Sequence, residues 1–172
     1  KENILLGLGA ESLIKDTIIW HQQKFKSRNS LNTFPNFFMY EIFLKIFHYK
    51  KFYFKIDAIN PKKTNTDKII DIIKNKKISL LIIVNPAHPF EKYWTNKEIE
   101  KILNYAKQKR VFVIIDEVYQ GMGSRSCINL TKKYDNFVVI KSASKTFGYP
   151  GGRIAFAIGH KKIIKQIETF RL

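Results

Sequence analysis

The chain has 172 residues, which suits one ordinary domain and is too short for two of typical size. Hydrophobic residues make up 45% and charged residues 26%, a balance that excludes a disordered or fibrous protein. Lysine and arginine outnumber aspartate and glutamate by 31 to 14, which gives a net charge of +17, and no apolar run is long enough to span a membrane.

The positive charge first suggests nucleic acid or an anionic membrane surface as a partner. Only 5 of the 31 cations are arginine, however, whereas grooves that bind phosphates or bases usually favour the arginine fork. We therefore interpret most of the charge as solvated surface. The single cysteine, Cys127, excludes an internal disulfide and a Cys-based zinc cluster, and the spacing of the histidines suggests no metal site.

Short apolar runs alternate with segments of helical periodicity along the first half of the chain. The pattern predicts a strand at Asn3–Leu8 and a helix that begins at Gly9 and ends near Phe25. Residues 27–37 hold serine, asparagine and proline and are predicted to form a loop. The following expected elements are a helix at Phe38–Tyr49, a strand at Lys51–Ile56, a polar connection at 60–66 and a helix at Asp67–Asn75.

The second half of the chain is dominated by nearly continuous aliphatic runs, as expected for parallel strands that are covered on both faces. The predicted strands are Ile78–Val84, Val111–Ile115, Phe137–Ile140 and Arg153–Ile158. Thr95 and Glu98 have the spacing of a capping box, which predicts a helix from there to about Lys109, and a basic helix is expected from about Lys161. This alternation predicts an α/β layer architecture with a mainly parallel sheet.

Chemically distinctive residues follow several of these strands. Asp116 and Tyr119 follow one strand, Ser142, Ser144 and Lys145 follow the next, and His88 lies just after Ile78–Val84. The first strand leads into Gly9, Ala10 and Glu11 at a helix N-terminus. Because ligands of open parallel sheets bind beyond the carboxyl ends of the strands, we expect these groups to meet at one edge of the sheet.

Such an edge has the chemistry to hold pyridoxal 5′-phosphate (PLP). A helix N-terminus, serine hydroxyls and Arg153 can bind a phosphate, and a strand-end carboxylate can pair with a protonated ring nitrogen. A tyrosine can donate to a phenolic oxygen. A lysine among these groups can form an imine with an aldehyde, so all four functional groups of the cofactor have a candidate partner.

The sequence resembles the large domain of fold-type I PLP enzymes, the class I/II aminotransferases, and is most similar to their histidinol-phosphate aminotransferase branch. The matching stretches occur in the family's order across nearly the whole chain: GAESLI (9–14), PNFFMY (35–40), VNPAHP (84–89), IIDEVYQGM (114–122) and SASKTFGYPGGRIAF (142–156). The last stretch is the most specific, because it combines S-x-S-K with an arginine eight residues after the lysine.

The resemblance implies a role for each matching residue. Lys145 would form the Schiff base with the cofactor and would then shuttle a proton between the substrate and the cofactor. Asp116 would keep the pyridinium nitrogen protonated, and Tyr119 would hydrogen-bond the ring O3′. Phe37 falls where the family places an aromatic that stacks on the ring. The cofactor phosphate would be bound by Gly9, Ala10, Glu11, Ser142, Ser144 and Arg153.

The sequence departs from the family's usual N-P-x-N-P-T-G motif, in which the second asparagine donates to O3′. His88 takes that place and is followed by Pro89, Phe90 and Glu91, so the path of residues 89–92 is expected to differ. A neutral imidazole can still donate an N–H to a phenolate oxygen. The departure also leaves open a non-catalytic protein that keeps the PLP fold.

The resemblance implies a three-layer αβα fold, incomplete at both ends, with residues 1–172 as part of the PLP-binding large domain and the C-terminal small domain absent. The implied activity is amino-group transfer between an amino acid and a keto acid or phosphorylated keto substrate, in a cytoplasmic homodimer. A decarboxylase of a phosphorylated amino acid is the alternative within the fold, because its chemistry uses the same lysine, aspartate and phosphate-binding groups.

A nucleic-acid-binding module is the alternative from a different class of protein. Its best support is the segment FHYKKFYFK (47–55), in which lysines and aromatics interleave as in a base-stacking platform. Against it, the segment alternates as a sheet strand does, and no recognition helix accompanies it. We therefore expect small molecules rather than nucleic acid or a membrane as partners.

Overall fold

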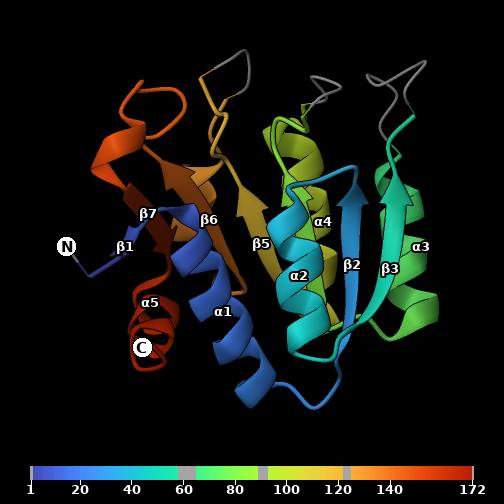
Figure 1. Cartoon of the computed structure of the whole chain (residues 1–172). Helices are drawn as coiled ribbons and strands as arrows, with labels where there is room; N and C mark the ends of the chain where they lie inside the picture. Colours follow the sequence, from blue (N-terminus) through green and yellow to red (C-terminus); the bar gives the residue numbers. More distant parts are fainter. Residues whose placement is uncertain (1, 58–64, 89–92, 122–124, 172) are drawn as a thin grey trace.

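A seven-stranded sheet with helices on both faces forms the body of the protein in the computed structural model, which describes residues 2–57, 65–88, 93–121 and 125–171 (Figure 1). The strands are β1 (Ile4–Leu8), β2 (Asn29–Phe34), β3 (Lys50–Lys55), β4 (Leu80–Val84), β5 (Phe112–Asp116), β6 (Phe137–Ser142) and β7 (Ile154–Gly159). The helices are α1 (Ala10–Lys24), α2 (Phe38–Ile46), α3 (Thr66–Lys76), α4 (Asn96–Gln108) and α5 (Lys161–Glu168), with short 3₁₀ turns at Ile128–Lys132 and Pro150–Gly152.

The order of the strands across the sheet is β1-β7-β6-β5-β4-β2-β3. Strands β3, β2, β4, β5 and β6 pair in parallel, whereas β7 pairs antiparallel with both β6 and β1. Because β7 alone reverses among the described strands, the carboxyl end of β1 lies at the same edge as the carboxyl ends of the parallel strands. The residue that begins β7 lies at that edge too.

Two hydrophobic cores, one on each face of the sheet, hold the layers together. On one face α1, α2 and α5 cover alternate residues of β4 to β7, among them Leu80, Ile114 and Val138. On the other face α3 and α4 cover the intervening residues, such as Leu81, Val113 and Val139. Figure 1 shows α1, α2 and α5 in front of the sheet and α3 and α4 behind it. The predicted three-layer αβα fold with a mainly parallel sheet is therefore confirmed.

The capping box predicted for α4 is present. The Thr95 hydroxyl accepts the Glu98 backbone N–H at 3.3 Å, and the Glu98 carboxylate accepts the Thr95 N–H at 2.8 Å. The two bonds satisfy N–H groups that have no partner within the helix. They fix where α4 begins.

One predicted element is wrong. Residues 27–37 were expected to form a loop, but Asn29–Phe34 is strand β2, which lies between β3 and β4. The predicted helix at Phe38–Tyr49 also ends earlier, at Ile46, because Tyr49 leads into β3. Most of the expected polar connection at 60–66 lies outside the described residues.

No helix within the described residues is both long enough and apolar enough to cross a lipid bilayer.

Candidate active site

A cavity of about 400 Å³ opens at the sheet edge where the parallel strands end. Its walls come from the starts of α1 and α2, the carboxyl ends of β4, β5 and β6 with the segments that follow them, and the residue before β7. Figure 1 shows these strand ends and helix starts at one edge of the sheet. The lining residues are Ala10, Glu11, Asn36, Phe37, Phe38, Val84, His88, Asp116, Val118, Tyr119, Ser142, Ser144 and Arg153. All the residues predicted for the site line this cavity except Gly9 and Lys145, which lie beside it.

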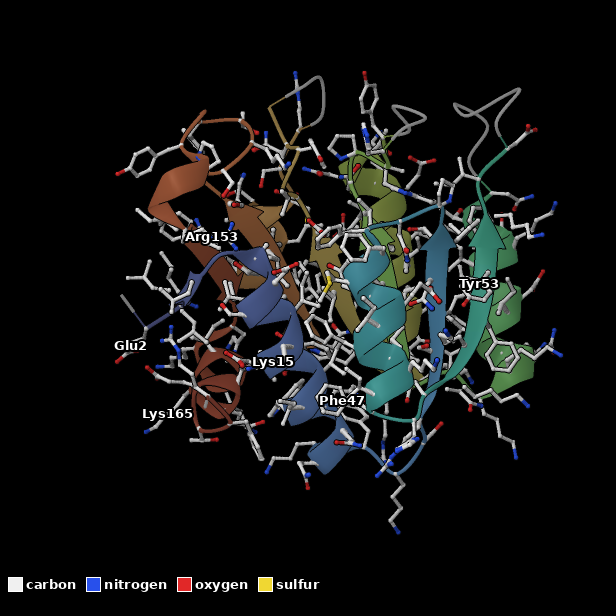
Figure 2. The ribbon with its side chains drawn as sticks, viewed as in Figure 1. Glu2, Lys15, Phe47, Tyr53, Arg153 and Lys165 are labelled. Atoms are coloured by element: carbon white, nitrogen blue, oxygen red, sulfur yellow. The ribbon has the colours of Figure 1, made fainter. Side chains whose placement is uncertain are left out.

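The start of α1 and the start of β7 form the end of the cavity that suits an anion. Gly9, with φ +80°, is the N-cap of α1, and no side chain caps the helix there. The Gly9 N–H donates to the Arg153 carbonyl at 2.7 Å, which holds the two segments together. Figure 2 places Arg153 beside the start of α1. Free helix N–H groups and a guanidinium together favour a phosphate or carboxylate.

The two serines after β6 have different partners. The Ser142 hydroxyl accepts the Ser144 backbone N–H at 3.1 Å, which shapes the turn that follows the strand. The Ser144 hydroxyl is buried and has no hydrogen-bond partner among the described residues. Because a buried hydroxyl without a partner is costly, the Ser144 hydroxyl is available to a ligand in the cavity.

Asp116 is the buried acid of the cavity, with only 4% of its surface exposed. One carboxylate oxygen accepts the Val118 N–H at 3.0 Å and the other accepts the hydroxyl of Tyr40 at 2.9 Å. Burial raises the pKa of Asp116 to about 6, although these two hydrogen bonds act to lower it. At neutral pH Asp116 is therefore mostly a carboxylate that can accept a further N–H.

Three side chains gather above the carboxyl ends of β4, β5 and β6. The His88 ring stacks on the Tyr119 ring, with 5.1 Å between centroids and 15° between planes. The Lys145 Nζ atom lies over the same tyrosine ring, 5.6 Å from its centroid. Tyr119 therefore lies against both Lys145 and His88, the residue that replaces the asparagine of the family motif. The expected change of path after His88 falls on residues 89–92, which lie outside the described residues.

Sequence reasoning missed several residues that belong to this site: Asn36, Phe38, Tyr40, Val84 and Val118. Tyr40 holds Asp116, and the Asn36 side-chain amide is buried without a hydrogen-bond partner among the described residues. The stretch PNFFMY contained three of these residues. It was used only for Phe37, because nothing in the sequence shows which of its neighbours face the strand ends.

Arg153 forms no ion pair with Asp116 or Glu117 among the described residues. Glu117 instead accepts from the Lys141 ammonium at 3.5 Å, and Asp116 is held by Tyr40 and Val118. The Arg153 guanidinium is thus left for the cavity.

The segment at 47–55 provides few free aromatic rings. It forms edge strand β3, in which Phe52 and Phe54 pack against the core and Phe54 contacts Trp94 edge-on at 5.8 Å. The Tyr49 and Tyr53 hydroxyls bond to His21 and Glu41. Most rings that a base would stack on are therefore used within the fold.

Comparisons with known proteins agree with the geometry. The sequence model of the family Aminotransferase class I and II matches residues 1–171. Histidinol-phosphate aminotransferase of Clostridium novyi (strain NT) is 30% identical over 171 residues, which are 99% of this chain and 46% of that protein.

Solved structures show the same fold. The histidinol-phosphate aminotransferase from Clostridium acetobutylicum matches with a TM-score of 0.81 and 26% identity, over 97% of this chain and 48% of that one. The PLP-bound C-S lyase from Staphylococcus hominis matches with a TM-score of 0.84 and 18% identity, over 100% of this chain and 46% of that one. The chain thus spans about half the length of the proteins it matches. With the family model matching almost from end to end, this chain belongs to the class I and II aminotransferase family.

Proposed function

We propose that the chain is the cofactor-binding part of the large domain of a PLP-dependent aminotransferase, with Lys145 as the residue that joins the cofactor. The observation that carries the proposal is the single cavity lined by Asp116, Tyr119, Ser144 and Arg153. These side chains come from three segments, at the ends of β5 and β6 and before β7, and each has the chemistry to bind one of the functional groups of PLP. Family membership supports the same conclusion.

The residues of the cavity fit PLP in their donors and acceptors. The unpartnered Ser144 hydroxyl, the uncapped start of α1 and the Arg153 guanidinium would bind the phosphate. Buried Asp116 would accept a ring N–H, and Phe37 and Val118 provide apolar wall against which a ring packs. Tyr119 and His88 supply the groups that would hydrogen-bond the ring oxygen.

Each residue then has a defined task. PLP, when bound, supplies an electron-accepting ring that stabilises a carbanion at the substrate Cα. With PLP bound, the Asp116 carboxylate would hold a proton on the ring nitrogen, and the Lys145 amine would carry a proton to and from the reacting carbon. The phosphate-binding groups fix the orientation of the ring, so that binding energy at one end positions the reaction at the other.

The partners follow from the same family relationship. We infer a small-molecule amino donor and a keto acceptor, one of which carries a phosphate, as the names of the histidinol-phosphate relatives suggest. The full-length protein is proposed to act as a homodimer in the cytoplasm.

Covalent attachment of the cofactor tests the proposal directly. With PLP added, the full-length protein is expected to show an absorption band in the visible or near ultraviolet that is lost in Lys145→Ala. Borohydride reduction and peptide mass spectrometry should find the cofactor on Lys145. Lys162→Ala, at an exposed position on α5, is the matched control and should keep both signals. No band in the full-length protein, or attachment at another lysine, would contradict the proposal.

A second measurement separates the two activities that the fold supports. An aminotransferase should turn over glutamate with a keto acid and release no carbon dioxide. Carbon dioxide release from a phosphorylated amino acid, without keto-acid consumption, would favour the decarboxylase instead.

Gly9→Ala is expected to weaken PLP binding by about tenfold, which corresponds to roughly 1.4 kcal/mol. A Cβ at this position would lie 2.4 Å from the Arg153 guanidinium nitrogen Nη2, and Gly9 has a positive φ of +80°. The new methyl group therefore displaces Arg153 and strains the start of α1. The dissociation constant of PLP checks this result. Gly151→Ala is the control, because a Cβ there meets nothing within 4 Å, and equal weakening in both variants would refute the expectation.

A further inference from the structure

Two turns carry the reactive pair of the site, and one hydrogen bond joins them. Tyr119 lies in the turn after β5, and Lys145 lies in the turn after the neighbouring strand β6. The Thr146 hydroxyl donates to the backbone carbonyl of Gln120 at 2.7 Å. Thr146 directly follows Lys145 in the sequence, and Gln120 directly follows Tyr119. The bond therefore fixes the lysine turn against the tyrosine turn one residue beyond each reactive side chain.

Gly121 makes this contact possible. Its φ is +111°, a conformation that L side chains rarely adopt, and a Cβ there would lie 2.4 Å from the Thr146 methyl carbon Cγ2. Any larger residue would push the two turns apart. The close approach of the turns thus depends on a glycine on one side and a small β-branched hydroxyl residue on the other.

The tyrosine turn is itself anchored to the sheet. The Gln120 side chain accepts from the Lys141 ammonium of β6, and Lys141 also pairs with Glu117 at 3.5 Å. The Glu117 side chain is fully buried and accepts the Cys127 backbone N–H at 2.7 Å. These contacts hold the backbone carbonyl of Gln120 in place. Its hydrogen bond with the Thr146 hydroxyl therefore positions the turn that carries Lys145.

Lys145 depends on this placement. In the described part of the chain its ammonium has no hydrogen-bond or ion-pair partner, and it lies over the Tyr119 ring, 5.6 Å from the ring centroid. The position of its own turn therefore decides where the amine lies. We propose that Thr146 is a positioning residue that sets the Lys145 amine for reaction with the cofactor, and that Gly121 is the partner it requires. This inference rests on the function proposed above.

The test compares two ligands of the full-length protein. The neutral Lys145 amine condenses with the PLP aldehyde to form an imine and release one water molecule. Pyridoxamine 5′-phosphate has an amine in place of the aldehyde and binds through the phosphate and ring alone. In Thr146→Val, which keeps the shape of threonine and removes its hydroxyl, the rate of covalent PLP attachment is expected to fall about tenfold. The dissociation constant of pyridoxamine 5′-phosphate should stay within about twofold. Thr146→Ser keeps the hydroxyl and should attach PLP at the wild-type rate.

The melting temperature provides a control for general damage. The bond lies at the surface, so its loss should change the melting temperature by no more than about 2 °C. Attachment of PLP to Thr146→Val at the wild-type rate would overturn the inference. An equal loss in the PLP attachment rate and in the affinity for pyridoxamine 5′-phosphate would overturn it too. A wild-type protein that does not join PLP at Lys145 would instead overturn the proposed function, and the inference with it.

Gly121 provides an independent test by compensation. Gly121→Ala alone should slow attachment at least as much as Thr146→Val, because its methyl group meets Cγ2 of Thr146. Serine has no such methyl group, so the double variant Gly121→Ala/Thr146→Ser should attach PLP faster than Gly121→Ala alone. Additive or worse behaviour of the double variant would contradict a direct contact between these turns.

Discussion

Replacing Asp116 with alanine in the full-length protein is expected to lower the rate of amino-group transfer about 10²- to 10³-fold. The buried carboxylate is the group in the cavity that can hold a proton on the ring nitrogen of bound PLP. Without that proton the ring accepts electrons less readily. The measurement is kcat with saturating donor and acceptor. A variant that keeps a tenth of the activity would contradict this role.

The pH dependence of PLP binding to the cofactor-free protein has a defined sign. The pKa of Asp116 is about 6, because burial raises it more than the Val118 and Tyr40 hydrogen bonds lower it. Asp116 in the cofactor-free protein loses its negative charge as the pH falls through 6, so the affinity of that protein for PLP should fall on the acid side of this value.

Tyr40→Phe is the matched control for this pH limb. It removes the hydroxyl that donates to Asp116 and keeps the carboxylate and the packing of the ring. Because that hydrogen bond lowers the pKa of Asp116, the acid limb of PLP binding should move to higher pH while the affinity at pH 8 is largely kept. An unchanged limb would mean that another group sets it.

The fold was predictable where hydrophobic pattern and burial agree. Strands β4 and β5 are buried at every residue, and their aliphatic runs predict covered parallel strands. β2 was missed because it carries Ser30, Asn32 and Thr33 into the interior, where all three are completely buried. Thr33 accepts the Val84 N–H at 3.3 Å, so neighbouring strands satisfy side chains that resemble a loop in sequence.

The site was predictable where chemistry follows a strand directly. Asp116 and Lys145 were found in this way, because the carboxyl ends of parallel strands meet at one edge. Tyr40 could not be found in this way, because it is 76 residues from Asp116 in the sequence. Its hydroxyl reaches the carboxylate only because α2 packs over the strand ends. The hydrogen bond from Thr146 to the Gln120 backbone carbonyl could not be predicted either, because every residue has a backbone carbonyl and the pattern of side chains does not show which one is the acceptor.

Acid is expected to destabilise the protein through His21, by about 3 kcal/mol between pH 6.5 and pH 4. This residue of α1 is completely buried. Its Nε2 lies 3.0 Å from the Ser79 carbonyl, which can only accept, so Nε2 carries the hydrogen and Nδ1 accepts the Tyr49 hydroxyl at 2.6 Å. The neutral ring fits both partners.

Burial lowers the pKa of His21 to about 4, below its usual value of 6.5. Above pH 6.5 the ring is neutral in both the folded and the unfolded chain, and the stability is complete. As the pH falls from 6.5 to 4, the unfolded chain takes up a proton that the folded protein excludes, so the free energy of unfolding decreases. Below pH 4 both states are protonated and this contribution no longer changes.

Urea denaturation of the full-length protein at pH 7.5 and pH 4.5 measures the effect. His21→Phe should be less stable at pH 7.5 by about 1–3 kcal/mol, because the buried Tyr49 hydroxyl loses its acceptor and the Ser79 carbonyl keeps only the Phe112 N–H as a donor. It should also lose less stability than the wild type between the two pH values. His48→Asn replaces an exposed histidine and should keep the wild-type pH dependence. Equal pH dependence in His21→Phe and the wild type would show that His21 is not the group that titrates.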